Sequence, residues 1–207
     1  MMWVPLEAAT GRAPSRAQPP PRPGGIPCRM TPSAPSFLVR EATEADLPAL
    51  ASLGARLARM HHRMDPRRFF VVDGMEKGYA WWLGKERRNR KAIVLAAVRK
   101  GRGGGESVVG YAYGRIEPRD WNALREECGV GIDLMVEPRA RRAGIGAALV
   151  EALAAGLAAR GAPRVVIQVA ARNPRAQAVF GGRGFRPTMV EMTRELAPRA
   201  RSRARRR

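Results

Sequence analysis

Residues 132–170 read IDLMVEPRARRAGIGAALVEALAAGLAARGAPRVVIQVA, and they predict a strand, a helix and a second strand in succession. The first strand ends before Pro138, because proline has no backbone N–H to donate to a sheet. Isoleucine or leucine then recurs every four residues from 145 to 157, which is typical of one buried helix face. Gly161 and Pro163 predict the helix end. Such a unit favours two parallel strands joined by a crossover helix.

The rest of the chain predicts a mixed sheet around this unit. A hairpin with a glycine-rich tip is expected over 92–116, and leucines at helical spacing follow Thr43, which begins a helix. A second helix is expected over 75–90, and Asn173 with Pro174 begins a short third one after the parallel pair. The expected fold class is α/β, a mostly antiparallel sheet of six or seven strands with a central parallel βαβ unit. Strands are expected at 37–41, 92–98, 108–116, 132–136, 165–170 and 189–196.

Length and composition indicate one globular domain with polar ends. The chain has 207 residues, of which 45% are apolar and 27% charged, so it can bury a core. We place the domain at 37–196. Residues 1–36 contain nine of the 17 prolines, and 197–207 contain six arginines and no acid, so both ends are expected to be disordered. Met30 is an alternative start of translation.

The cellular setting follows from what the sequence lacks. No apolar stretch reaches the roughly 18 residues that a membrane-spanning helix needs, so a membrane-spanning protein is not expected. The two cysteines, Cys28 and Cys128, are too few for a disulfide framework, which favours a reducing compartment. We therefore expect a cytoplasmic protein.

The net charge of +20 raises the question of nucleic-acid binding. Residues 1–36 and 197–207 carry +3 and +6 of it, which leaves +11 for 37–196. Arginine supplies 34 of the 38 basic residues, an excess that a coding bias would also produce. Nucleic-acid binding is therefore kept as an alternative function, limited to weak binding through 197–207.

The segment from Arg141 to Gly146 predicts an anion site. It lies between a strand and a helix N-terminus, where unpaired N–H groups and the helix dipole attract negative charge. Gly144 and Gly146 let the backbone approach a phosphate closely, since no Cβ intervenes. A Walker loop is excluded because no Gly-Lys-Ser/Thr is present, and a dinucleotide fingerprint is excluded because Leu149 stands where glycine or alanine is needed.

Two motifs resemble the GNAT superfamily of N-acetyltransferases. Arg141-x-x-Gly144-x-Gly146 is similar to its Gln/Arg-x-x-Gly-x-Gly/Ala signature, and the preceding Leu134-Met135-Val136 resembles its fourth strand. Downstream, the segment from Asn173 through Phe180 to Phe185 resembles its Asn-x-x-Ala-x-x-Leu-Tyr-x-x-x-Gly-Phe motif. The resemblance covers 37–196.

The resemblance implies acetyl transfer from acetyl-CoA to a primary amine, of a small molecule or a protein, without a metal. It implies that the fourth and fifth strands splay apart and that backbone groups of Leu134, Met135 and Val136 bind the pantetheine. Asn173 and Phe180 would then lie near the sulfur. The cradle for the pyrophosphate would comprise Arg141, Arg142, Ala143, Gly144, Ile145, Gly146 and Ala147. The acceptor and the oligomeric state, with a homodimer as one option, stay open.

The catalytic groups depart from the family pattern. The usual acid is the tyrosine of Leu-Tyr, but Phe180 stands there and cannot donate a proton. Water or another residue would replace it, and we name Tyr111 as the first candidate, with Tyr113 and Cys128 as further ones. Asp133 is the only carboxylate inside its strand, which makes it the candidate base.

For several other residues, the sequence allows both a functional and a structural interpretation. His61 and His62 could act as a base near neutral pH or form a polar helix end. Trp81 and Trp82 are expected to pack, and Glu126 and Glu127 to lie in a solvated loop or to form an acidic mouth with Asp133. Because of Phe180, a CoA-binding sensor or regulator without catalysis is the main alternative function.

Overall fold

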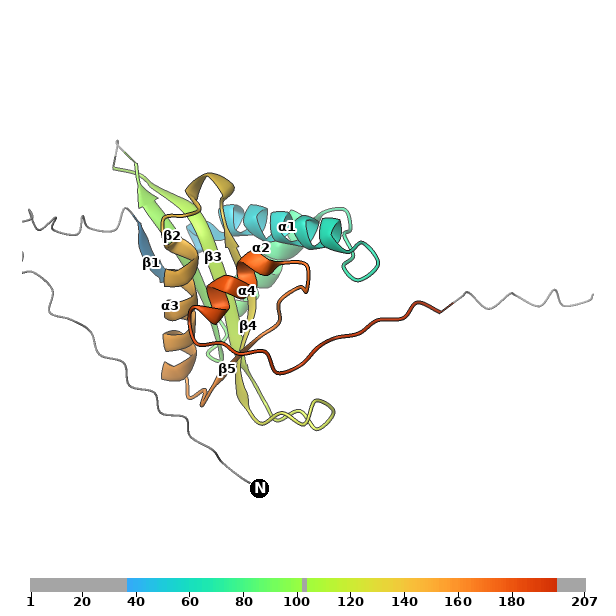
Figure 1. Cartoon of the computed structure of the whole chain (residues 1–207). Helices are drawn as coiled ribbons and strands as arrows, with labels where there is room; N and C mark the ends of the chain where they lie inside the picture. Colours follow the sequence, from blue (N-terminus) through green and yellow to red (C-terminus); the bar gives the residue numbers. More distant parts are fainter. Residues whose placement is uncertain (1–36, 102–103, 197–207) are drawn as a thin grey trace, which may run out of the picture. The chain divides into compact units, whose positions relative to one another are not determined.

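The structure is a computed structural model that describes residues 37–101 and 104–196 (Figure 1). The disorder expected for 1–36 and 197–207 therefore concerns residues outside the described ones. In chain order the elements are β1 (Leu38–Glu41), the 3-10 helix η1 (Glu44–Asp46), α1 (Leu47–Met64), α2 (Met75–Glu86), β2 (Ala92–Lys100), β3 (Glu106–Glu117), β4 (Cys128–Val136), the 3-10 helix η2 (Pro138–Ala140), α3 (Ile145–Ala159), β5 (Val165–Ile167) and α4 (Pro174–Gly181).

Five strands form one sheet in the order β1-β2-β3-β4-β5. Neighbouring strands are antiparallel except β4 and β5, which run parallel and are joined through α3. The predicted fold class is confirmed, including the parallel βαβ unit. That unit lies at the edge of the sheet rather than at its centre, and the described sheet has five strands rather than six or seven.

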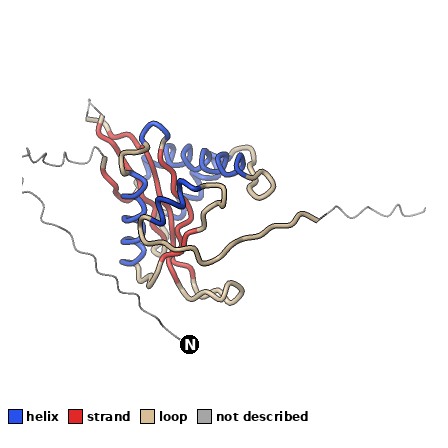
Figure 2. The backbone as a smooth tube through the Cα atoms, viewed as in Figure 1, coloured by secondary structure: helices blue, strands red, loops and turns tan. Residues whose placement is uncertain are grey.

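Three of the predicted strands differ clearly from the observed ones. β5 covers only Val165–Ile167 rather than 165–170. β4 begins at Cys128 rather than at 132, because Gly129 and Gly131 continue the strand where α3 packs closely. A methyl group on Gly129 would lie only 3.0 Å from the Leu157 side chain. Met189–Leu196 forms no strand, because no described strand pairs with its backbone, and it extends away from α4 (Figure 2).

The helices cover the two faces of the sheet (Figure 1). α1 and α2 pack on one face, where Leu50, Leu53 and Leu57 meet the rings of Tyr111 and Tyr113. α3 packs on the other face through the leucines that the sequence pattern predicted. β2 lies between these layers, which is why its apolar run is buried from Ala92 to Val98. Alternate residues of β3 and β4 therefore face different helices.

A buried carboxylate fixes the start of the first helical segment. Asp46 accepts hydrogen bonds from the N–H and the hydroxyl of Thr43, at 2.7 and 2.8 Å. The guanidinium of Arg40 in β1 donates to both of its oxygens, at 2.7 and 3.1 Å. The hydrogen bonds from Arg40 and Thr43 lower the pKa of Asp46 to about 2, although burial opposes them. The pair thus ties η1 and α1 to the edge of the sheet.

We predict that Asp46→Asn lowers the free energy of unfolding by about 2 kcal/mol at pH 7, because a charged, bidentate partner of Arg40 is lost. Since the folded pKa is depressed, this contribution is present above pH 4 and disappears as the pH falls toward 2. Urea titrations at pH 7 and at pH 3 measure it. The matched control is Glu106→Gln, which removes the more exposed partner of Arg40 and should cost less than about 1 kcal/mol.

Candidate functional site

β4 and β5, at one edge of the described sheet, separate partway along β4. β4 pairs with β3 along its whole length, but with β5 only at Gly129, Val130 and Gly131. The register with β3 passes from Gly131 directly to Asp133 and skips Ile132, so β4 carries a β-bulge there. From Ile132 onward, no described strand pairs with β4 on the β5 side. The splay that the resemblance implied is therefore present in the described fold.

A cavity of about 60 Å³ lies at this separation. Five residues singled out in the sequence line it together, among them Asp133 and Leu134 from β4, Asn173 at the start of α4, and Phe180 within α4. The end of α1 closes the cavity with His61. Residues from five separate segments of the chain, including α3 and the end of β5, thus meet at one site.

The loop after β4 has the geometry of an anion cradle. The Arg141 side chain donates to the carbonyl of Val136 at 3.2 Å, which holds the loop to the strand end. Arg142 and Gly144 have left-handed φ angles of 66° and 78°, and Gly144 is the N-cap of α3. The first-turn N–H groups, from Ile145 to Ala147, have no acceptor within the helix and remain for a ligand.

Gly146 has open space beside it in this cradle. A Cβ added at Gly146 would meet only the Val136 side chain, at 3.8 Å, which is an ordinary contact. The protein's own packing therefore does not require glycine at this position, whereas close approach of a pyrophosphate would. This space and the free N–H groups fit the pyrophosphate of CoA.

We predict that Gly146→Asp folds normally but loses CoA binding. The new side chain has room, and an acidic residue is favourable in a first helical turn, yet its charge would repel a pyrophosphate. The stabilisation of the wild type by 1 mM CoA in a thermal-shift assay should be abolished. The control is Ala155→Asp, the same charge on an exposed face of α3, and an equal loss in that variant would contradict the site.

Asp133 and Tyr111 form the polar centre of the site. The Tyr111 hydroxyl donates to Asp133 Oδ2 at 2.8 Å, from a fully buried position in β3. Burial raises the pKa of Asp133 from 3.8 to about 6, and the hydrogen bond from Tyr111 opposes this rise. Burial and the charge of Asp133 raise the pKa of Tyr111 well above its ordinary value. Among the described residues, no arginine or lysine forms an ion pair with Asp133.

The other candidate residues divide between the site and the core. His61 lines the cavity, stacks on Phe69 at 4.9 Å, and has a pKa lowered by burial. His62 is instead hydrogen-bonded through Nδ1 to the carbonyl of Phe69 at 2.7 Å, which holds the loop after α1. Tyr113 donates to Glu86 in the core.

Three further predicted roles are settled by position alone. Cys128 is buried at the far end of β4, where it pairs with β3, and it does not line the cavity. Glu126 pairs with Arg119 in the loop before β4, and neither it nor Glu127 lines the cavity beside Asp133. Trp82 packs edge-on against Tyr113 at 4.8 Å, whereas Trp81 is exposed.

Sequence reasoning missed Tyr79 of α2. Burial raises its pKa, and the charge of Asp133 adds to this rise. The one signal in the sequence was Gly54, an unfavourable residue within a helix. A side chain at Gly54 would overlap the Tyr79 ring, so this glycine lets α2 pack closely against α1.

Comparisons with known proteins agree with this geometry. The sequence model of the Acetyltransferase (GNAT) family matches residues 57–185. The protein therefore belongs to the GNAT family of acetyltransferases. No curated protein sequence matches the chain significantly.

Solved structures share the fold at low sequence identity. A tetramutant of a Bacillus halodurans protein is 21% identical, with a TM-score of 0.63, and the match covers 77% of this chain and 99% of that one. An aminoglycoside N-acetyltransferase in complex with CoA is 15% identical, with a TM-score of 0.59, over 83% of this chain and 100% of that one. Glucosamine-6-phosphate N-acetyltransferase from Arabidopsis thaliana is 14% identical, with a TM-score of 0.54, over 78% and 99%.

No helix of the described residues is both long enough and apolar enough to cross a membrane.

Proposed function

We propose that this protein is an enzyme that transfers the acetyl group of acetyl-CoA to a primary amine in the cytoplasm. One observation carries the proposal. The unpaired edge of β4, a carboxylate with a raised pKa and the anion cradle of α3 all lie along one strand and the loop that follows it. That arrangement suits a long thioester with a pyrophosphate at one end and a reacting carbonyl at the other.

The binding roles follow from the free backbone groups. Backbone groups of Leu134, Met135 and Val136 on the unpaired edge would hydrogen-bond the pantetheine, and the N–H groups from Arg142 to Ala147 would bind the pyrophosphate. Asn173 accepts the Ala176 N–H at 3.2 Å through Oδ1, as predicted for an N-cap, which leaves its NH2 group for a ligand. A backbone N–H of β4 would stabilise the negative charge that develops on the thioester oxygen.

Asp133 is the proposed general base. An acceptor amine arrives as an ammonium and must lose a proton before its lone pair can attack the thioester carbon. With a pKa of about 6, Asp133 is largely ionised at neutral pH yet basic enough to accept that proton. Tyr111 fixes the carboxylate by its hydrogen bond, so we assign it as a positioning residue rather than the acid.

The proton for the departing sulfur is proposed to come from water. Phe180 lines the cavity where the family places its acid, and it offers no proton. Tyr113 and Cys128 lie outside the cavity. The Tyr111 hydroxyl is already engaged as the donor of the hydrogen bond to Asp133. Amide formation then releases the thiolate of CoA, which gains a proton from solvent.

A CoA-binding sensor is the second candidate function, and Phe180 is the observation that favours it. The decisive experiment is a screen for release of free CoA from acetyl-CoA with amines, peptides and amino sugars as acceptors. Release that depends on an acceptor supports the enzyme. Thermal stabilisation by acetyl-CoA without release for any acceptor supports the sensor. Nucleic-acid binding concerns residues 197–207, and deletion of that segment tests it separately.

We predict that kcat rises with pH with a midpoint near pH 6 and reaches a plateau at higher pH, because only ionised Asp133 accepts a proton. Asp133→Asn should lower kcat by about 10² to 10⁴-fold. It should also remove a pH effect on stability. Because the pKa of Asp133 is raised in the folded state, the folded wild type binds more protons than the unfolded chain does. Its free energy of unfolding therefore falls as the pH rises from about 4 to 6. An unchanged kcat in this variant would refute the assigned base.

We predict that Tyr111→Phe moves the midpoint of the kcat profile upward by about one pH unit, because the hydrogen bond that lowers the pKa of Asp133 is lost. The ring remains in the core, so the packing is kept. Tyr113→Phe is the matched control, since its hydroxyl donates to Glu86 in the core. An unmoved midpoint in Tyr111→Phe, or the same movement in the control, would show that Tyr111 has only a structural role.

A further inference from the structure

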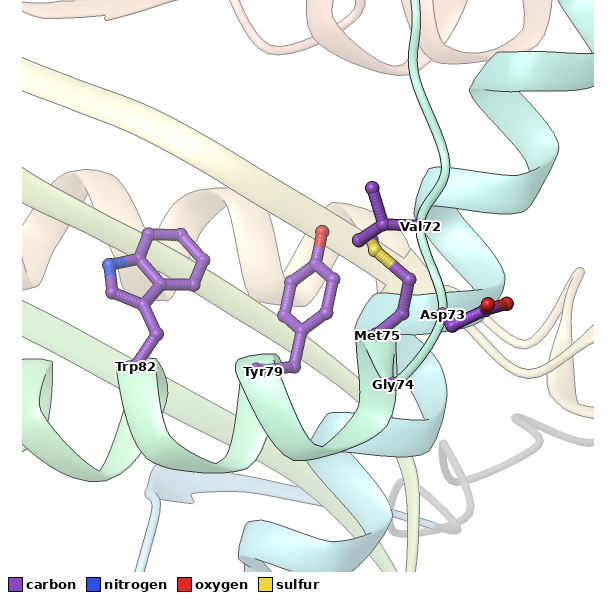
Figure 3. A pocket seen from close by; sticks show the side chains of 7 residues that line it. Val72, Asp73, Gly74, Met75, Tyr79 and Trp82 are labelled. Carbon is purple, nitrogen blue, oxygen red and sulfur yellow. The ribbon is translucent and has the colours of Figure 1, made fainter.

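A second hollow, of about 410 Å³, opens beside α2. The side chains of Val72, Met75, Tyr79 and Trp82 border it from one side, whereas the carboxylate of Asp73 points away (Figure 3). Its lining contains no lysine or arginine. The hollow is therefore bordered by apolar and aromatic groups, and the Tyr79 hydroxyl is a polar atom within this wall.

The aromatic wall is held in place by packing. The Tyr79 ring lies against Gly54 of α1, and the Trp82 ring meets it edge-on at 5.8 Å. Trp82 in turn packs edge-on on Tyr113, whose hydroxyl donates to the buried Glu86 at 2.8 Å. These contacts leave the two outer rings little freedom, so the wall is formed before any ligand arrives.

Tyr79 connects this hollow with the reaction site. Its ring packs against the buried cluster that contains Tyr111 and Tyr113, and the Tyr111 hydroxyl donates to Asp133 at 2.8 Å. Burial, and then the charge of Asp133, raises the pKa of Tyr79. The Tyr79 hydroxyl forms no hydrogen bond with another described residue, whereas the hydroxyls of Tyr111 and Tyr113 both do. A ligand in the hollow would thus have a polar group at the end that leads to the base.

We propose that this hollow binds the acceptor, and that the acceptor is a primary amine on an aromatic or apolar body. The body would pack on Val72, Met75 and Trp82, while the ammonium passes the ring face of Tyr79 toward Asp133. This inference rests on the proposed acetyl transfer and names its substrate class.

The same lining disfavours two other classes of amine. A phosphorylated amino sugar needs a cationic partner for its phosphate, and the hollow has none in its lining. A polycationic amino sugar needs several carboxylates and many hydrogen-bond partners, but the one lining carboxylate, Asp73, points away (Figure 3). Desolvating such polar acceptors against an apolar wall costs free energy that an apolar amine does not lose.

The first experiment compares acceptors by acetyl-CoA-dependent release of CoA. We expect kcat/KM for 2-phenylethylamine and tryptamine to exceed that for glucosamine 6-phosphate and kanamycin by at least about tenfold. A preference for either amino sugar would overturn the inference about the substrate class while leaving acetyl transfer itself supported.

The second experiment places a charge in the hollow. Met75→Lys should raise KM for 2-phenylethylamine by about tenfold or more and leave KM for acetyl-CoA unchanged, because the added cation repels the ammonium. Ala155→Lys, on an exposed face of α3, is the control for added charge. Equal KM values in Met75→Lys and the wild type would overturn the inference.

A binding measurement separates this inference from the proposed function. N,N-dimethyl-2-phenylethylamine, a tertiary amine that cannot yield a stable amide, should raise the melting temperature of the wild type but not of Met75→Lys. If that difference appears and no amine is acetylated, the binding site stands and the proposed function fails. If acetylation occurs and the analogue stabilises both proteins equally or neither, the function stands and the site fails.

Discussion

The β-bulge at Ile132 is the constraint on which the site depends. Without it, the register at Gly131 would continue by one residue, and Asp133 would lie opposite Ala112 on the face covered by α3. With it, Asp133 lies opposite Tyr113 on the face of α1 and α2, next to the Tyr111 hydroxyl. The pairing with β5 ends at the same point. One extra residue thus turns the carboxylate toward its partner and marks the place where the neighbouring strand leaves β4.

The sequence predicted those parts of the fold that depend on patterns over a few neighbouring residues. The α3 leucines, the Asn173 cap and the parallel pair follow rules that act over a few residues, and the structure confirms them. The family resemblance pointed to Leu134, Asn173 and Phe180, and Asp133 was the only carboxylate inside its predicted strand. The structure brings all four to one cavity. Their chemical roles remain predictions.

What the sequence could not predict depends on packing between distant segments. The strand over Met189–Leu196 had the right composition, but a strand needs a neighbour whose backbone is free, and sequence does not show one. The contact between Gly54 and Tyr79 joins two helices, so neither residue alone indicates it. The link between Tyr111 and Asp133 requires the β3–β4 register, which the bulge shifts by one residue.

Within residues 37–101 and 104–196, no arginine forms an ion pair with Asp133, which sets this carboxylate apart. Most described carboxylates pair with arginine, as Glu117 does with Arg115 and Arg125. Such a partner beside Asp133 would lower its pKa and occupy the place that an ammonium needs. Burial beside a neutral tyrosine has the opposite effect, because it raises the pKa of Asp133 to about 6. It also leaves no side-chain cation among the described residues to compete with an ammonium for this carboxylate. In a domain with an excess of arginine, a carboxylate kept in this state is suited to receive a cation from outside, which is what a protonated amine acceptor provides.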